Sequence, residues 1–535
     1  MNINNTPWWQ RAVFYQIYPR SFMDSNGDGV GDLQGILDRL DYLVKLGVDA
    51  VWISPIFPSP MADFGYDVAD YTGIEPIFGD METFDRLLSE AHRGGLRIVL
   101  DYVPNHSSIE HPWFIESRSS RENPKRDWYI WKDPLPDGSP PNNWEATTGG
   151  SAWNWDDNRG QYYLAQFIKD EPDLNWLNPE VVSAMEDVLH FWLRKGVDGF
   201  RMDMLPHLVE HPDFPDNPPI PADHPFRSIG LTLEQVHTVD QPETHAIVRR
   251  FRKIFESYEG DRVIIGETPL FDMAKLASCY GQNLDEVHIP FNFKLLLTGW
   301  NAGKMKAVLE EYYAAIPEGA VPSIVFGNHD FARIATRFGR QNLRSAAVLL
   351  LTLWGVPTMY YGDEIGMENG DIPPDRLQDP WADPGKGTGR DPERTPMQWK
   401  NSPNAGFSPP GVKTWLPVAD NYRSINADSQ EGDPDSNLNF YRRLLKLRRD
   451  LPALHEGGFE FFDPVPQGVL AYTRRSGEQQ ILVLVNFESQ PHQLDLSPLG
   501  AGARTLLSTE SGEQDRVDLS RVGLGPNQSL ILMLE

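Results

Sequence analysis

Three carboxylic acids follow three short apolar segments of this sequence. Asp203 ends the segment G-F-R-M-D, Glu267 ends V-I-I-G-E, and Asp330 ends I-V-F-G-N-H-D. A fourth segment, I-V-L-D-Y-V-P-N-H, ends in Asn105 and His106. Short apolar runs of this kind are typical of buried parallel strands. Because the carboxyl ends of parallel strands meet on one rim, we expect these side chains to lie together, and carboxylates buried there need a function or firm partners.

Two of these acids could cleave an acetal together, one as the nucleophile and the other as the general acid. Arg201 and Asp203 alternate along one strand and face the same side, so we expect Arg201 to keep Asp203 ionised and aimed as a nucleophile. If the surroundings of Glu267 are apolar, desolvation favours the protonated form that a general acid needs. A charged and a protonated carboxyl group about 5–5.5 Å apart define a retaining glycosidase. A buried Asp–Arg pair can also simply tie strands together, but three carboxylates on three strands favour catalysis.

The other polar residues on the same rim fit more than one role. His106 and His329 are hydroxyl-binding donors in a wall for a polyol, or they are polar caps on their strands. Asp330 could share protons with Asp203 or Glu267, or bind adjacent hydroxyl groups of a substrate.

Eight strand-like segments recur along the chain with helical patterns between them. Strands that alternate with helices form a parallel sheet, and eight such units favour closure of that sheet. The sequence therefore predicts an α/β fold, a (β/α)8 TIM barrel. The eight segments are 14–18, 49–53, 97–103, 199–203, 262–267, 286–291, 323–327 and 357–361.

Two irregular stretches and a change of pattern divide the chain. Residues 107–177 are rich in Pro, Trp, Asn, Asp and Gly and are too long for a plain loop, so we expect an inserted subdomain after the third strand. The barrel then comprises residues 1–106 and 178–452, with a polar insertion near 367–426 that we interpret as a lid over the rim. Alternating apolar segments predict a C-terminal antiparallel β-sandwich domain over 453–535.

The segment D-S-N-G-D-G-V-G-D resembles a cation-binding loop. Its alternate positions match the first part of a calcium loop, but Gly35 stands where an EF-hand has its glutamate. We expect a single structural Ca²⁺ or Mg²⁺ site, with a metal-free turn as the alternative. The expected ligands are Asp24, Asn26, Asp28, the carbonyl of Val30, and Asp32.

Composition limits the partners and the compartment. The 535 residues carry a formal net charge of −28, so nucleic acid and anionic membrane surfaces are poor partners. A single cysteine, Cys279, excludes an internal disulfide framework. We see no signal peptide and no apolar stretch of the ~20 residues that a spanning helix needs, so we expect a cytoplasmic protein. The sequence does not indicate an oligomeric state.

The motifs, in their order along the chain, resemble those of a known enzyme family. D-Y-V-P-N-H (101–106), G-F-R-M-D (199–203), G-E (266–267) and F-G-N-H-D (326–330) look like the signature set of the α-amylase family, glycoside hydrolase family 13. G-Y-D-V-A-D-Y (65–71), E-P-D-L-N-W (171–176), Y-G-D-E-I-G-M (361–367) and R-T-P-M-Q-W (394–399) resemble its α-glucosidase and oligo-1,6-glucosidase branch. The resemblance covers nearly the whole chain, and it also supports the cation loop.

This resemblance implies a role for each residue on the rim. Asp203 would be the nucleophile, Glu267 the acid/base, and Asp330 the carboxylate that binds ring hydroxyls and supports distortion. Tyr66 would stack on the apolar face of a terminal glucose. Polar and charged side chains would bind the hydroxyl groups of that glucose. Those hydroxyl-binding residues would be Asp63, His106, Arg201, His329 and Arg390.

The sequence therefore predicts an exo-acting retaining α-glucosidase that releases terminal glucose from short oligosaccharides or α-glucosides, with transglucosylation as a side reaction. A dedicated transferase or isomerase, such as a sucrose isomerase or trehalose synthase, is the alternative on this scaffold. A non-catalytic sugar-binding relative would be expected to have lost one of the carboxylates. Two departures from the pattern bear on specificity. Glu171 stands where the branch usually has Gln, and Met204 stands where the family usually has Thr, Ala or Val, so linkage preference is open.

Overall fold

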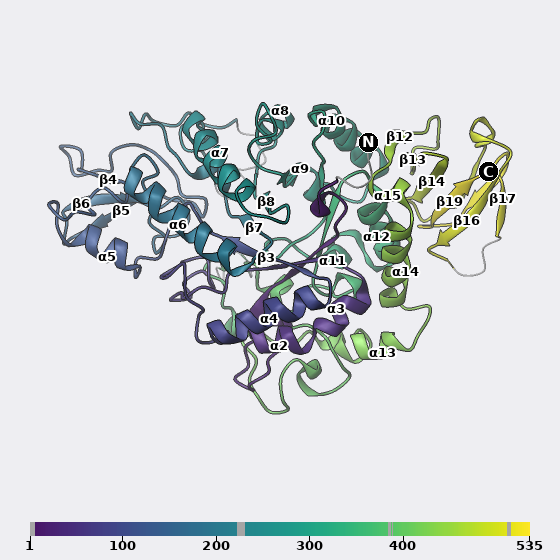
Figure 1. The fold of residues 1–535 in the computed structure, drawn as a ribbon, viewed down its shortest axis with the longest axis horizontal. Coiled ribbons are helices and arrows are strands. Elements are labelled where there is room, and N and C mark those ends of the chain that lie inside the picture. The colour runs from purple at the N-terminus through teal and green to yellow at the C-terminus, as the bar shows by residue number, and fades with distance from the viewer. Residues whose placement is uncertain (1–5, 222–230, 383–386, 388, 511–514) are drawn as a thin grey trace.

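An eight-stranded parallel sheet, curved into a near-closed barrel, forms the centre of the molecule (Figure 1). The computed structural model describes residues 6–221, 231–382, 387, 389–510 and 515–535. Neighbouring strands follow the order β10-β11-β1-β2-β3-β7-β8-β9. The strands are β1 Phe14–Ile17, β2 Ala50–Ile53, β3 Arg97–Tyr102, β7 Gly199–Met202, β8 Val263–Gly266, β9 Ile289–Pro290, β10 Ser323–Val325 and β11 Val356–Tyr360. All eight predicted strands are present, and the predicted barrel is confirmed.

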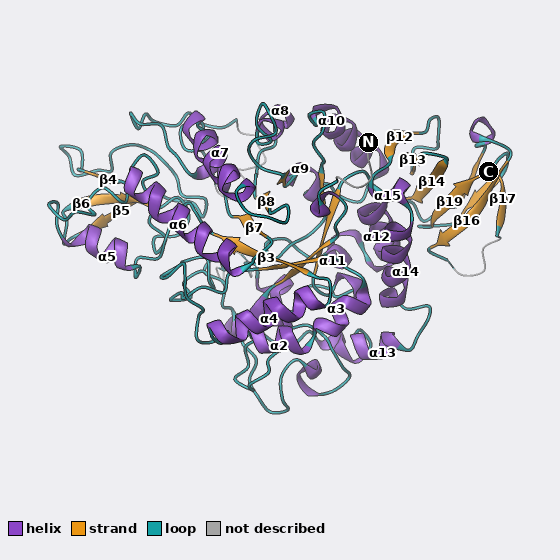
Figure 2. Ribbon diagram, viewed as in Figure 1, coloured by secondary structure: helices purple, strands orange, loops and turns teal. Residues whose placement is uncertain are grey.

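Helices between the strands cover the outside of the barrel (Figure 2). Their ends follow local chemistry: Asn178 caps α6 with Pro179 in its first turn, and Gly196 ends it in the left-handed conformation. Residues 33–46 contain two helices, because the chain leaves helical geometry at Arg39. The longer helices are α2 Leu33–Asp38, α3 Leu40–Leu46, α4 Met81–Arg93, α6 Pro179–Lys195, α7 Pro242–Glu256, α8 Met273–Ser278, α10 Ala302–Ala315 and α12 Leu343–Thr352. Shorter ones are α1 Pro19–Phe22, α9 Phe293–Leu296, α11 Ile334–Phe338 and α13 Ala427–Glu431.

A small antiparallel sheet interrupts the barrel between β3 and α6. Helix α5 (Pro112–Ser119) precedes its strands, which are β4 Trp131–Lys132, β5 Trp153–Asp156 and β6 Gln161–Leu164, in the order β4-β6-β5. It has a core of its own that includes Ile130, Trp144 and Trp153. Figure 1 shows this sheet at one end of the molecule, beyond α6.

Two helices, α14 (Asn437–Asp450) and α15 (Pro452–His455), lead from the barrel into a second antiparallel sheet. Six strands pair in the order β12-β13-β14-β19-β16-β17, and β15 pairs with β18, which confirms the predicted C-terminal antiparallel domain. These strands are β12 Gly458–Phe461, β13 Val469–Ser476, β14 Gln479–Asn486, β15 His492–Leu494, β16 Gly502–Ser508, β17 Arg516–Asp518, β18 Val522–Leu524 and β19 Ser529–Leu534. Alternate leucines such as Leu482, Leu484, Leu530 and Leu532 form the core of this domain.

Among the described residues, no helix combines the length and apolar character needed to cross a bilayer. The predicted cytoplasmic location is not tested by this finding and stays a prediction.

Candidate active site

One guanidinium group gathers three carboxylates at the carboxyl ends of β3, β7 and β8. Arg201 Nη1 lies 2.8 Å from Asp101 Oδ1 and 2.6 Å from Asp203 Oδ1, and Nη2 lies 2.6 Å from Glu267 Oε2. The parallel register explains the convergence, because Arg201 pairs with Asp101 on one side and with Ile265, two residues before Glu267, on the other. The structure therefore brings Asp203 and Glu267 together around one position.

Three buried carboxylates around a single cation carry an excess of negative charge. Burial raises the pKa of Asp203 well above its usual range, and repulsion from Glu267 and Asp101 adds to this while Arg201 opposes it. Burial likewise raises the pKa of Asp101 to about 6 against the attraction of Arg201.

The surroundings of Glu267 differ from the apolar environment that would make it a general acid by desolvation. Its Oε2 contacts Arg201 at 2.6 Å and accepts a hydrogen bond of 3.1 Å from the Met204 backbone N–H. Met204 directs that N–H from a left-handed backbone conformation, with φ 41° and ψ 41°. Such a conformation costs a residue with a side chain about 1–2 kcal/mol, so the fold stores strain next to Asp203 in order to hold Glu267. A cation and a backbone donor, rather than an apolar pocket, therefore surround the Glu267 carboxyl group.

Asp330 has a separate set of partners, which are two arginines and His329. Its Oδ1 lies 3.2 Å from Arg390 Nη1 and 3.0 Å from Arg394 Nη2, and its Oδ2 lies 3.4 Å from His329 Nε2. Burial opposes ionisation, but the His329 Nε2 contact and the positive charges of Arg390 and Arg394 outweigh it and hold the pKa of Asp330 well below its usual range. Of the two predicted roles for Asp330, this arrangement favours hydroxyl binding by a permanent carboxylate over proton sharing.

The degree of exposure differs among the three acids. Asp330 keeps 21% of its side chain exposed, whereas Asp203 keeps 8% and Glu267 6%. Solvent and small molecules therefore reach the cluster most readily beside Asp330.

Tyr66 and His329 form a hydrogen-bonded wall between the two sets of acids. The Tyr66 hydroxyl lies 2.7 Å from His329 Nε2 and 3.2 Å from Asp101 Oδ2. The Gln16 amide nitrogen lies 2.8 Å from His329 Nδ1, which leaves the proton on Nε2, facing Tyr66 and Asp330. Burial lowers the pKa of His329 well below its usual range, so this imidazole is neutral.

His106 faces Glu171 across a short gap. His106 Nδ1 lies 2.9 Å from Asn105 Oδ1, and its Nε2 lies 3.5 Å from Glu171 Oε1. Within the described part of the chain, neither that nitrogen nor that oxygen has a hydrogen-bond partner. Burial lowers the pKa of His106 to about 3 and raises that of Glu171 well above its usual range, with help from Asp63 and Asp67. Two buried, unpaired polar atoms side by side are suited to a substrate hydroxyl.

Asp63 and Arg390, two of the predicted hydroxyl-binding residues, are in contact, although 327 positions separate them. Arg390 also contacts Asp379 at 2.7 Å, and its guanidinium lies 4.2 Å from the ring centroid of Trp381. All nine residues predicted for catalysis and substrate binding thus lie in one connected cluster. The predicted lid segment supplies Arg390, and residues 383–386 and 388 of that segment lie outside the described residues.

Sequence reasoning missed three members of this cluster. Asp101 and Arg394 stand inside motifs that resemble the family's, D-Y-V-P-N-H and R-T-P-M-Q-W, and a charged residue in such a motif is the signal that could have found them. Asp379 lies in a loop without periodicity, and no pattern pointed to it.

The predicted cation loop is built from its own hydrogen bonds. Asp24 accepts from the backbone N–H groups of Gly27 (2.6 Å) and Gly29 (2.9 Å), and Asp32 caps α2 by accepting from Gly35 N–H at 2.6 Å. Gly29 is required, because its φ is +93° and a Cβ there would meet the Lys413 carbonyl oxygen at 2.2 Å. In the described ranges, no group of three or more His, Cys, Asp or Glu is arranged around a metal position. The donors are all oxygens, which fits a hard cation chemically.

Comparison with known proteins identifies the family. Residues 16–457 match the α-amylase catalytic domain, and residues 459–530 match the C-terminal domain of maltogenic amylase. A probable α-glucosidase of Rhizobium meliloti is 40% identical over 90% of this chain and 90% of its own length. An oligo-1,6-glucosidase of Heyndrickxia coagulans is 39% identical over 92% of this chain and 94% of its own length.

A solved structure agrees with these sequence matches. The crystal structure of an α-glucosyl transfer enzyme superimposes with a TM-score of 0.91 and 39% identity, over 99% of this chain and 100% of that one. The barrel, the acids at its carboxyl rim and these matches together show that the chain belongs to the α-amylase family of glycoside hydrolases.

Proposed function

We propose that this protein is an exo-acting retaining α-glucosidase that removes terminal glucose from short oligosaccharides or α-glucosides. The observation that carries the proposal is the contact of one guanidinium, that of Arg201, with both Asp203 and Glu267 at 2.6 Å. Relatives named α-glucosidase and oligo-1,6-glucosidase cover about nine-tenths of the chain and support the same activity.

In the proposed reaction, Asp203 attacks the anomeric carbon while Glu267 gives its proton to the glycosidic oxygen. The aglycone leaves, and the glucosyl group is held as an ester of Asp203. Glu267 then takes a proton from water, which attacks the same carbon and frees Asp203 with retention of configuration. As Asp203 forms its ester it loses its charge, and Arg201 then stabilises the carboxylate of Glu267.

The remaining residues would hold one glucose unit. Asp330, kept ionised by its cations, would bind ring hydroxyls and offset the positive charge that develops at the anomeric carbon. Tyr66 would lie against the sugar, and His106 and His329, both neutral, would exchange hydrogen bonds with hydroxyls. Asp63 and Arg390 would bind the non-reducing end, which limits the enzyme to terminal units.

Transglucosylation would follow from the same intermediate. An acceptor hydroxyl can replace water in the second step, because Glu267 can take a proton from either. The similarity to an α-glucosyl transfer enzyme supports this side reaction.

The cation loop would hold a structural Ca²⁺ or Mg²⁺ through Asp24, Asn26, Asp28, the Val30 carbonyl and Asp32. The bound ion would neutralise clustered carboxylates and stiffen the loop against the segment around Lys413. It would take no part in the reaction.

A substrate panel tests the proposal. Glucose release is measured from maltose, isomaltose, sucrose and an aryl α-glucoside, and the anomer first released is identified by NMR. We expect α-glucose from at least one of them. Conversion of sucrose or maltose into an isomer without net hydrolysis would instead assign a dedicated isomerase, and inactivity on all four would refute the proposal.

A further inference from the structure

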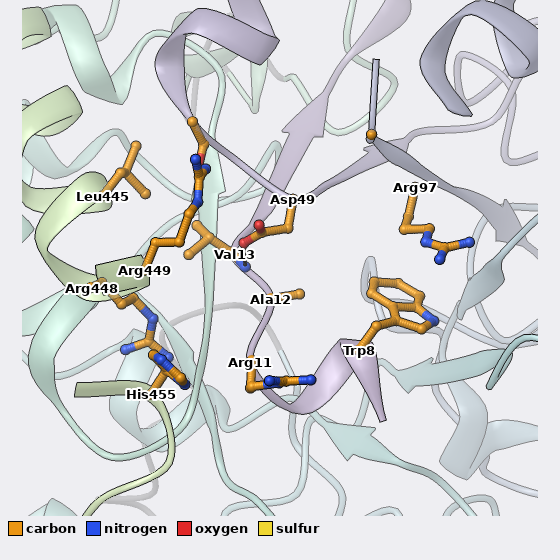
Figure 3. A pocket seen from close by; sticks show the side chains of 12 residues that line it. Trp8, Arg11, Ala12, Val13, Asp49, Arg97, Leu445, Arg448, Arg449 and His455 are labelled. Atoms are coloured by element: carbon orange, nitrogen blue, oxygen red, sulfur yellow. Dashed lines mark hydrogen bonds between the residues drawn. The ribbon is translucent and has the colours of Figure 1, made fainter. Parts of the chain in front are cut away.

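A cavity of about 350 Å³ lies at the end of the barrel opposite the candidate active site (Figure 3). Its walls come from residues at the amino ends of β1, β2 and β3, and from helices α14 and α15. The volume is at the lower end of the roughly 300–1,000 Å³ of small-molecule sites, and it exceeds what a single ion needs. The candidate active site, by contrast, uses the carboxyl ends of the strands.

The lining of this cavity is rich in cations although the whole chain is acidic. Arg11, Arg97, Arg448 and Arg449 line it, with Asp49 as the only acid among its lining residues. Figure 3 shows Arg448 and Arg449 on one side of Asp49 and Arg97 on the other. So many arginines in one place repel one another unless anions balance them.

Two of the four arginines have their anions elsewhere in the protein. Arg11 Nη1 lies 3.3 Å from Glu456 Oε1, and Arg97 Nη1 lies 3.0 Å from Asp198 Oδ1. Arg448 and Arg449 have no carboxylate within ion-pair distance in the parts of the chain that the structure describes. They leave the cavity with a net positive charge.

Arg448 is the more deeply buried of the two arginines that lack an ion-pair partner among the described residues. It is 1% exposed, and its guanidinium donates to the carbonyls of Leu351, Leu454 and Gly355, each at 2.9 Å. Its Nε has no partner among the described residues. Burial lowers the pKa of Arg448 to about 9, with repulsion from Arg474 adding to the effect and attraction from Asp49 opposing it. A buried cation of this kind is costly, and a nearby anion would offset the cost.

Asp49 attracts Arg449, Arg448 and Arg11 at once, so its single charge is shared among three arginines. Its Oδ2 accepts a 2.8 Å hydrogen bond from Val13 N–H, and burial raises its pKa. Arg449 is exposed, and among the described residues its side chain donates one hydrogen bond, of 2.6 Å from Nη2 to the Gly47 carbonyl, so its other donors can serve a ligand. Across the cavity Trp8 presents an indole ring (Figure 3).

We infer that this cavity is a binding site for a small phosphate-bearing molecule, whose phosphate is held by Arg11 and Arg449 beside the buried charge of Arg448. A phosphate offers three strong acceptor oxygens, more than a carboxylate does, so it can accept from arginines on separate segments of the chain. Guanidinium groups bind phosphate through paired N–H donors, and the remaining volume and the Trp8 ring accommodate an organic part. Because the site joins the barrel to α14 and α15, its ligand stabilises the junction with the C-terminal domain and does not compete with a glucoside.

Thermal unfolding of the full chain tests the inference, with inorganic phosphate, glucose 6-phosphate and adenosine monophosphate titrated against chloride at equal ionic strength. We expect a saturable rise in Tm for the wild type, and a preference for an organic phosphate if Trp8 contributes. Arg449→Gln and Arg11→Gln should each weaken the apparent affinity at least about tenfold, since each removes a charge-assisted contact. Arg443→Gln is the matched control, because Arg443 is an exposed arginine on the same helix that donates to the Pro434 carbonyl.

Three results would overturn the inference. One is the absence of a saturable rise for all three phosphates, and another is an unchanged affinity in both Arg449→Gln and Arg11→Gln. The third is competitive inhibition of glucoside hydrolysis by phosphate that persists in these variants, which would place the anion in the active site. Both substitutions are at partly or fully exposed positions outside the catalytic cluster, so kcat/KM on a glucoside should stay at the wild-type value.

Discussion

Replacing Arg201 by lysine separates the charge of this side chain from its shape. The guanidinium spans Asp203 and Glu267 with two different nitrogens, each at 2.6 Å, and it also holds Asp101. A lysine ammonium keeps the charge but cannot reach both acids from one point. The variant therefore loses at least one of these contacts.

The expected loss follows from that geometry. A hydrogen bond to a charged group contributes about 1.5–3 kcal/mol. At about 1.36 kcal/mol per factor of ten, loss of one contact lowers kcat/KM by roughly 10- to 150-fold. Attack requires ionised Asp203, and a weaker cation nearby lets the pKa of Asp203 rise further. The acidic limb of the pH profile should therefore move to higher pH.

The assay is kcat/KM on an aryl α-glucoside across the acidic and neutral range, with Tm recorded to show that the variant folds. Arg250→Lys is the control, because Arg250 makes a similar two-nitrogen contact with Glu186, at 2.6 and 2.9 Å, but is 54% exposed. Exposed pairs contribute about 0–1 kcal/mol, so this control should behave as wild type. Wild-type activity and an unshifted acidic limb in Arg201→Lys would refute the reasoning.

Other predictions follow from the same structure. Asp203→Asn should abolish glucoside hydrolysis without lowering Tm at neutral pH, because burial raises the pKa of Asp203 and its charge destabilises the fold; a lower Tm would contradict this. The pKa of Asp330 in the folded protein is depressed below its unfolded value of about 3.9, so its carboxylate stabilises the fold above that pH and this contribution is lost as the pH falls. Asp330→Asn should therefore show a shallower acid-induced fall in Tm than wild type. A chelator should lower the Tm of the wild type but not of Asp24→Ala, and an equal response would argue against a cation in the loop. Met204→Ala should change the ratio of kcat/KM for maltose and isomaltose, and an unchanged ratio would remove Met204 from linkage selection.

Local pattern was sufficient to locate the strands and the acids at their ends. Apolar runs bounded by polar residues identified all eight barrel strands, and alternation along β7 put Arg201 beside Asp203, as observed at 2.6 Å. The alternation of side chains along a strand and the ends of the strand depend on a few neighbouring residues, so they can be predicted from the sequence. The same pattern could not show that Glu267 contacts the same arginine, because that depends on the spacing of neighbouring strands.

Tertiary structure alone decided the partners and the protonation of the site. Asp63 contacts Arg390, which is 327 positions away in the sequence. Asp379 contacts the same arginine from a loop whose sequence shows no periodic pattern. The pKa of Asp203 depends on burial and on the number of charges around Arg201, and both are sums over the folded molecule. The cationic cavity beneath the barrel arises in the same way, since segments near residues 11, 97 and 448 approach one another only after the barrel has closed.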